Sequence, residues 1–141
     1  MMWGVVAQFC SALATFVVGL AAMNMGRTQT KASLFDHRFK VYSELSQAIA
    51  EINADAAVRD EALDAIHRGL HASRFLYSEE VYRQVDLIWH AANGARWLAP
   101  LEHRKRSKAE QEQEAHQREE INNVWAQLEP LMSRSLATWN R

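Results

Sequence analysis

The chain is poor in residues that interrupt helices or cross-link loops. Its 141 residues include one cysteine, two prolines and five glycines. The single thiol, Cys10, forms no disulfide within the chain, so a disulfide scaffold is excluded. Because breakers are few while Ala, Leu, Glu, Gln and Arg are abundant, the sequence predicts an all-α protein.

Charge is missing from the start of the chain. The first 26 residues contain no Asp, Glu, Lys, Arg or His. A helix of this length, at about 1.5 Å per residue, covers the ~30 Å hydrocarbon layer of a bilayer. We therefore predict that residues 1–26 form a transmembrane anchor in membrane lipid.

Two alternatives for this stretch are a cleavable signal peptide and a buried helix of a soluble protein. A signal peptide normally begins with basic residues, and none precedes Trp3. A buried helix is disfavoured because the remaining chain, about 115 residues, supplies too little apolar surface to enclose it. Arg27, Lys31, Arg38 and Lys40 come directly after it, and cations accumulate on the cytoplasmic side. We expect a single-pass protein of the cell (inner) membrane, with its N-terminus outside and residues 27–141 in the cytoplasm.

Small and polar residues recur every three or four positions along the predicted anchor. In lipid, such a stripe allows close helix approach and hydrogen bonding between helices. It predicts self-association into a homo-oligomer, although small residues are also common in membrane helices generally. The stripe consists of Gly4, Gln8, Ser11, Thr15, Gly19 and Ala22.

The remaining residues are nearly neutral, with sixteen Lys and Arg against seventeen Asp and Glu. Nucleic-acid-binding domains usually carry a clear basic excess, so nucleic acid is not expected as a partner. The length fits one small domain.

Apolar residues at helical spacing predict three amphipathic helices and a fourth with a polar beginning. The first covers about 33–53, with Ser33 as a possible cap. As an alternative, the anchor and this helix run on almost continuously, because the linker RTQTKAS at 27–33 contains no Pro or Gly. The second begins near Asp55 or Asp60, and the third begins at Ser78 and ends before Pro100. The expected inward positions are Leu34, Phe35, Phe39, Tyr42, Leu45, Ile49 and Ile52; Leu63, Ile66, Leu70 and Phe75; and Val81, Tyr82, Val85, Ile88, Trp89, Ala92 and Leu98.

Residues 102–120 form a polar, charged segment. We interpret it as a solvated loop followed by the polar first stretch of the fourth helix, or as cations that reach anionic lipid or an acidic partner. The apolar stripe returns from Ile121 to Trp139, and Pro130 should kink that helix. Such helices bury their stripes only against one another, so we predict an antiparallel three- to four-helix bundle.

The segments LFDHRFKVYSEL at 34–45 and ASRFLYSEEVYRQV at 72–85 carry a resemblance. They resemble uncharacterised small bacterial single-pass membrane proteins with an LFDRRFxVYxxL-like motif after the anchor. The resemblance implies this architecture and a bacterial source, but no established activity. The motif residues have a structural interpretation: Asp36 near a helix start favours the helix dipole, and Arg38 and Tyr42, four residues apart, stack or pair with a neighbouring helix. As an alternative, the candidate partner-binding residues, within the motif and near the predicted helix ends, are Asp36, Arg38, Tyr42, Trp97 and Trp139.

Residues that could carry chemistry are scattered. His67 and His71 share one helical face, but no close-spaced third ligand completes a metal site, so solvated histidines are expected. No Gly-rich phosphate loop, GxSxG or HExxH occurs. We predict no enzyme, no metal or other cofactor and no small-molecule substrate.

Two functions remain open. The first is a membrane-anchored interaction module that holds a protein partner at the cytoplasmic face of the membrane. The second is an oligomeric pore or membrane-perturbing effector assembled through the transmembrane helix. Monomeric behaviour in detergent would exclude the second.

Overall fold

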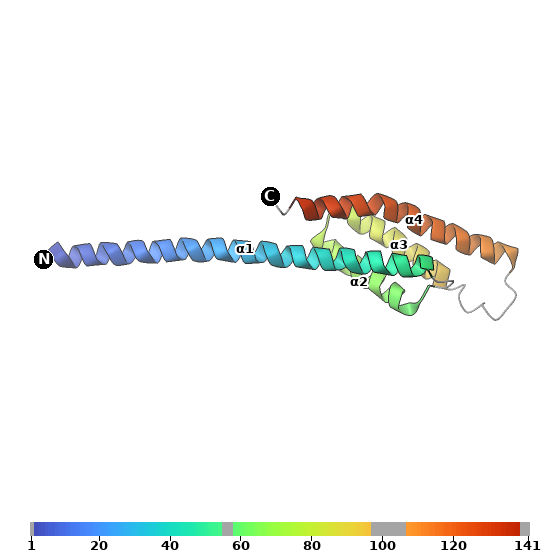
Figure 1. The fold of residues 1–141 in the computed structure, drawn as a ribbon, viewed down its shortest axis with the longest axis horizontal. Helices are drawn as coiled ribbons and strands as arrows, with labels where there is room; N and C mark the ends of the chain where they lie inside the picture. The colour runs from blue at the N-terminus through green and yellow to red at the C-terminus, as the bar shows by residue number, and fades with distance from the viewer. Residues whose placement is uncertain (1, 55–57, 97–106, 139–141) are drawn as a thin grey trace. The chain divides into compact units, whose positions relative to one another are not determined.

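The structure is a computed structural model that describes residues 2–54, 58–96 and 107–138, with side chains from residue 15 onward. Over these residues the secondary structure is all α-helical, and four helices pack as a bundle (Figure 1). They are α1 (Met2–Ala54), α2 (Asp60–Leu76), α3 (Glu79–Arg96) and α4 (Lys108–Ala137). The chain divides into two compact units, residues 1–34 and 35–141, which are considered separately below.

Helix α1 is uninterrupted for 53 residues. The Thr28 and Thr30 hydroxyls donate to the carbonyls of Asn24 and Gly26, at 2.9 and 2.8 Å, which absorbs two polar side chains without breaking the helix. The cap at Ser33 is wrong, because Ser33 lies in the interior of α1, whereas the continuous run of helix through residues 27–33 is confirmed. Asp36 lies in the interior of α1, so its expected interaction with a helix N-terminus is also wrong.

The core of the second unit follows the predicted apolar stripes. All four helices contribute side chains that are less than a tenth exposed. Two described residues of the predicted inward set are exposed instead, Phe39 at 52% and Phe75 at 84%, so these two predictions are wrong. Leu98 lies outside the described residues. The end of α2 turns Phe75 outward, while Leu76 and Tyr77 pack against the core. The largest fully buried side chains include Leu45, Ile52, Ile66, Val85, Ile88, Ile121, Leu128 and Met132.

Cross-helix contacts establish that α1 and α4 are antiparallel. Side-chain hydrogen bonds join Arg38 to Ser135, Tyr42 to Glu129 and Asn53 to Asn122. The residue numbers on α4 therefore decrease as those on α1 increase. Asp60, the first residue of α2, forms an ion pair at 2.9 Å with Arg96, the last residue of α3. The helices α2 and α3 are therefore antiparallel as well. The predicted antiparallel arrangement is confirmed for these pairs.

Two glycines allow helices to approach closely. A Cβ atom placed on Gly69 of α2 would lie 2.8 Å from Cδ2 of the buried Leu45 on α1. A Cβ on Gly94 of α3 would collide with the side-chain amide of Gln117 on α4. Glycine is required at both positions because there is no room for a side chain, and not because the backbone adopts an unusual angle.

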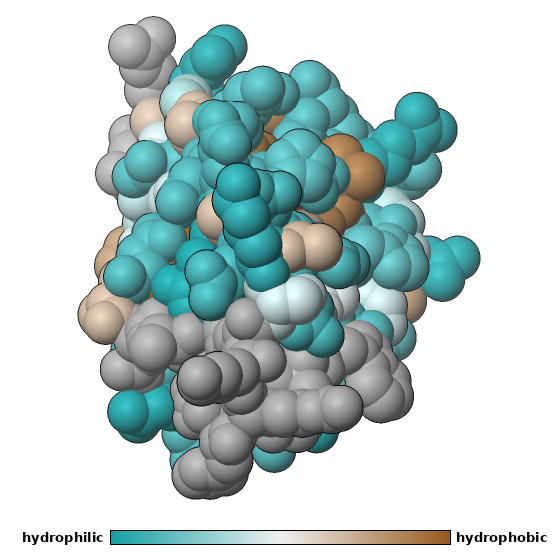
Figure 2. Space-filling model, turned by 90° about the vertical axis from the view of Figure 1, so that its right-hand side faces the viewer, coloured by the Kyte–Doolittle hydropathy of each residue, from teal (hydrophilic) through white to brown (hydrophobic). Residues whose placement is uncertain are grey.

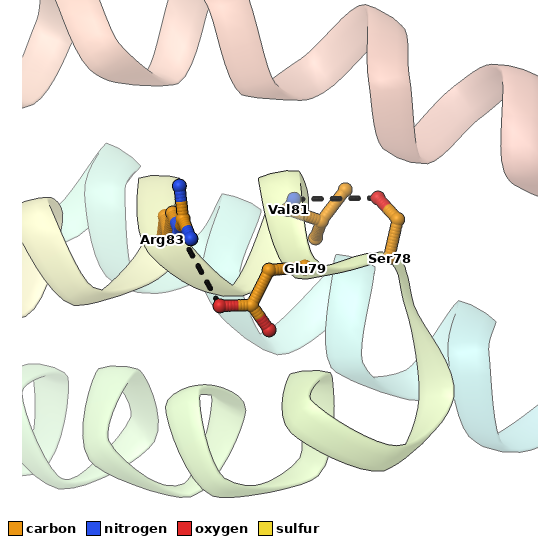
Figure 3. A network of polar contacts seen from close by, with 4 residues as sticks. All are labelled: Ser78, Glu79, Val81 and Arg83. Atoms are coloured by element: carbon orange, nitrogen blue, oxygen red, sulfur yellow. Dashed lines mark hydrogen bonds and ion pairs between the residues drawn. The ribbon is translucent and has the colours of Figure 1, made fainter.

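The helix ends are only partly as predicted. Ser78 precedes α3, and its hydroxyl accepts from the Val81 amide at 3.4 Å (Figure 3). Asp60 is the first residue of α2 rather than its cap, because the N-cap is Arg59; Asp55 lies outside the described residues.

Helix α4 begins inside the polar segment. Ser107 and Glu110 form a reciprocal capping box there, with bonds of 3.2 and 2.7 Å. Pro130 lies within α4, which continues past it to Ala137. Polar side chains dominate the face seen from the right of Figure 1 (Figure 2).

Among the residues that the structure describes, we find no helix with both the length and the apolar character needed to cross a membrane. Residues 1–14 of the predicted anchor lie outside the described side chains.

Candidate functional site

The motif residues Arg38 and Tyr42 belong to a group of contacting polar and aromatic side chains within the bundle, which we call the seam. Its other members are Tyr77, Trp125, Glu129 and Ser135. The Arg38 guanidinium donates to the Ser135 hydroxyl at 3.3 Å and lies 5.6 Å from the centre of the Tyr77 ring. The Tyr77 hydroxyl in turn donates to the Arg38 carbonyl at 2.7 Å. These contacts tie α1 to the C-terminal part of α4 and to the α2–α3 connection.

Tyr42 continues this seam toward α4. Its hydroxyl donates to the Glu129 carboxylate at 3.1 Å, and its ring stacks on Trp125 with centroids 6.1 Å apart. Burial, and then the hydrogen bond and charge of Glu129, raise the pKa of Tyr42 above its ordinary value. Burial raises the pKa of Tyr77 to about 12. Both side chains therefore remain neutral donors at physiological pH.

The aromatic residues of α1 lead from this seam to the surface. Phe39 is 52% exposed and stacks on Phe35 with ring centroids 6.2 Å apart. Its ring also lies 6.5 Å from that of Tyr42. Asp36 is exposed in the same part of α1. Within the motif, Asp36 and Phe39 are thus more accessible than the half-buried Arg38 and Tyr42.

The other predicted partner-binding residues, Trp97 and Trp139, lie outside the described residues. The side chains of Gln8 and Ser11 and the surroundings of Gly4 are also outside the part that the structure describes. The remaining stripe residues, Thr15, Gly19 and Ala22, are exposed on α1. Thr15 and Gly19 line an open groove together with Phe16, Leu20 and Met23.

The exposure of α1 is uniform before the bundle begins. Every described side chain from residue 15 to residue 33 is exposed. Six of them are large and apolar, with exposed fractions of 48–68%: Phe16, Val17, Val18, Leu20, Met23 and Met25.

Sequence reasoning missed an acidic groove between α1 and α2. It has a volume of about 290 Å³, and Glu44, Glu51, Glu61 and Arg68 are among its lining residues. Arg68 lies 3.9 Å from Glu44, which offsets part of the negative charge. The signal was present in the sequence as glutamates on the polar faces of two adjacent helices.

Candidate metal ligands are sparse. Within the described ranges, no three His, Cys, Asp or Glu side chains gather in a way that could hold a metal ion. His67 and His71 do come together, with their Nε2 atoms 3.1 Å apart.

No family model matches the chain, and no curated protein or solved structure is significantly similar.

Proposed function

We propose that the chain is a membrane-anchored helical module that holds a protein partner at the cytoplasmic face of the cell membrane. The observation that carries this proposal is the exposed apolar surface of α1 between residues 15 and 26. Contiguous apolar surface of this kind is typical of membrane or protein contact sites. Because the uncharged stretch extends back to residue 1, lipid is the cover that suits all of its faces.

The bundle supplies the part of the module that remains in water. Its helices bury their apolar stripes against one another, so it needs no lipid to form a core. Arg38 and Tyr42 hold the motif-bearing part of α1, residues 34–45, against α4 through hydrogen bonds to Ser135 and Glu129. We assign partner contact first to the exposed Asp36 and Phe39, with Trp97 and Trp139 as further candidates.

The second candidate function is an oligomeric pore assembled through α1. The groove beside Thr15 and Gly19 supports it, because a Cβ at Gly19 would meet nothing within 4 Å and a second helix could approach closely. This function requires several copies of the chain, since each copy provides one such helix.

Photo-crosslinking from two phenylalanines on α1 tests both functions. A benzoylphenylalanine replaces Phe16 in one variant and Phe39 in the other, and the full-length chains are irradiated in cells. We expect position 16 to label lipid and position 39 to label another protein. A dominant adduct with a second copy from position 16 would favour the pore, whereas adducts with diverse soluble proteins would contradict membrane anchoring. A lack of any protein adduct from position 39 would contradict partner contact there.

A reporter fused to the C-terminus tests the orientation. A fluorescent protein that matures only in the cytoplasm should be bright, and a phosphatase that is active only outside should be silent. The reverse pattern would contradict the proposed topology.

A further inference from the structure

Two histidines of α2 face each other on the surface of the bundle. His67 and His71 are four residues apart and exposed, and their ring centroids are separated by 4.5 Å at an interplanar angle of 77°. The ring of Trp89 on α3 lies 5.7 Å from that of His67, so the pair is bordered by a second helix. The spacing in the sequence places two histidines on one face, but it does not turn their rings toward one another.

The separation of the two Nε2 atoms, 3.1 Å, suits a shared metal ion. With metal–nitrogen bonds of about 2.0–2.1 Å, two nitrogens on one ion lie ~2.9 Å apart at a right angle and ~3.4 Å apart at a tetrahedral angle. The observed separation falls between these values. Two neutral rings of opposite tautomer can share a hydrogen bond at the same distance. A metal ion would take the place of that shared proton, which would move through water to Nδ1 of its own ring, and the helix would not need to move.

We propose that His67 and His71 form a two-ligand site for a divalent late transition-metal ion, with Cu²⁺ preferred over Ni²⁺ and Zn²⁺. Imidazole nitrogen is a favoured ligand of these ions, and the preference for Cu²⁺ follows their general order of affinity. The same i, i+4 spacing supplies two zinc ligands in helical HExxH sites. Ca²⁺ and Mg²⁺ prefer oxygen ligands and are excluded as occupants.

The surroundings determine what completes the coordination. In the part of the chain that the structure describes, no third His, Cys, Asp or Glu joins the pair in a metal-binding group. Both histidines are exposed, so water occupies the other positions of the ion. These positions are open to exchange for a ligand from another molecule.

Calorimetric titration of the full-length chain in detergent, with CuCl₂, NiCl₂ or ZnCl₂ in a non-coordinating buffer, tests the site. We expect a Cu²⁺ affinity above those for Ni²⁺ and Zn²⁺, and a loss of about tenfold or more in His67→Gln and in His71→Gln. His116→Gln, on the exposed surface of α4, is the matched control and should bind as the unaltered chain does. Circular dichroism of each variant establishes that α2 and the bundle remain folded.

Electron paramagnetic resonance of the Cu²⁺ complex provides a second readout. The unaltered chain should show coupling to two imidazole nitrogens, and each single variant of the pair should show coupling to one. Equal Cu²⁺ affinity in the unaltered chain and both pair variants would overturn the proposal. An equal loss of affinity in His116→Gln would overturn it as well.

Discussion

The two parts of α1 share one continuous helix but have opposite surroundings. From residue 15 to residue 33 every described side chain is exposed. From residue 41 to residue 52 the helix buries a stripe in which no side chain is more than 7% exposed: Val41, Leu45, Ala48, Ile49 and Ile52. The distribution of apolar residues, rather than their number, separates the two parts.

The spacing of the apolar residues explains this difference. Steps of three and four place the second set on one face, which leaves the opposite face polar and suited to water. The first set includes the consecutive residues Phe16, Val17 and Val18, which point to different sides of the helix. A helix that is apolar on all sides needs an apolar environment on all sides, and we assign that role to lipid.

Truncating one leucine in each part should give the largest contrast. Leu45 is fully buried, so Leu45→Ala should lower the free energy of unfolding of the bundle by about 2–5 kcal/mol. Leu20→Ala, on the same helix but 48% exposed, is the matched control and should leave that free energy nearly unchanged. Urea unfolding in detergent, followed by tryptophan fluorescence, measures both. Equal losses would break the distinction between the two parts.

Glycine substitutions sharpen the same contrast. Gly69→Val places side-chain atoms against Leu45 and should destabilise the bundle by about 1–3 kcal/mol. Gly26→Val meets open space on α1 and should have little effect on bundle unfolding. Gly69→Val that unfolds at the same urea concentration as the unaltered chain would show that α1 and α2 do not approach closely.

Alkaline pH should weaken the bundle through Tyr77. Below about pH 10 this tyrosine is protonated in both states. Its pKa is raised to about 12 in the folded chain, so between these values it ionises first in the unfolded chain and the free energy of unfolding falls. Tyr77→Phe should reduce this alkaline fall. At neutral pH it should lower the free energy of unfolding by about 1 kcal/mol, because the hydrogen bond to the Arg38 carbonyl is removed.

Unfolding series from pH 8 to pH 11 measure this effect. Tyr82→Phe on α3 is the control, and it should show the same alkaline fall in the free energy of unfolding as the unaltered chain because Tyr77 is retained. An alkaline fall of the same size in Tyr77→Phe and in the control would contradict the assignment.

The smallest effect should come from the exposed ion pair shown in Figure 3. Arg83 and Glu79 are 3.3 Å apart, but their side chains are 76% and 69% exposed. Solvent screens such pairs, so Arg83→Gln should change the free energy of unfolding by less than about 0.5 kcal/mol. A double-mutant cycle with Glu79→Gln isolates the pair. A coupling as large as the effect of Leu45→Ala would show that surface charge, rather than the buried stripe, holds the bundle together.

Much of the fold could be predicted from periodicity. Ile66 on α2, Ile88 on α3 and Ile121 on α4 are fully buried, as the helical spacing indicated. The pattern failed at Phe39 and at Phe75, which are 52% and 84% exposed although the spacing placed both on the inward stripe. The Ser107–Glu110 capping box had a visible signal, since Ser and Glu stand three residues apart in the sequence.

The candidate site was less accessible to sequence reasoning. The i, i+4 spacing placed Arg38 and Tyr42 together, but their partners Ser135 and Glu129 lie far along the chain. Such pairings depend on the register between α1 and α4, which one sequence does not determine. The facing rings of His67 and His71 likewise depend on side-chain rotamers.

Site-directed spin labelling of the full-length chain in lipid bilayers tests the membrane assignment most directly. In a Cys10→Ser background, single labels are placed along α1 from residue 16 to residue 33, and their accessibility to oxygen and to a water-soluble nickel complex is measured. We predict high oxygen and low nickel accessibility up to residue 25, with a reversal after Arg27, where charge begins. High accessibility to the nickel complex from residue 16 to residue 25 would contradict the account.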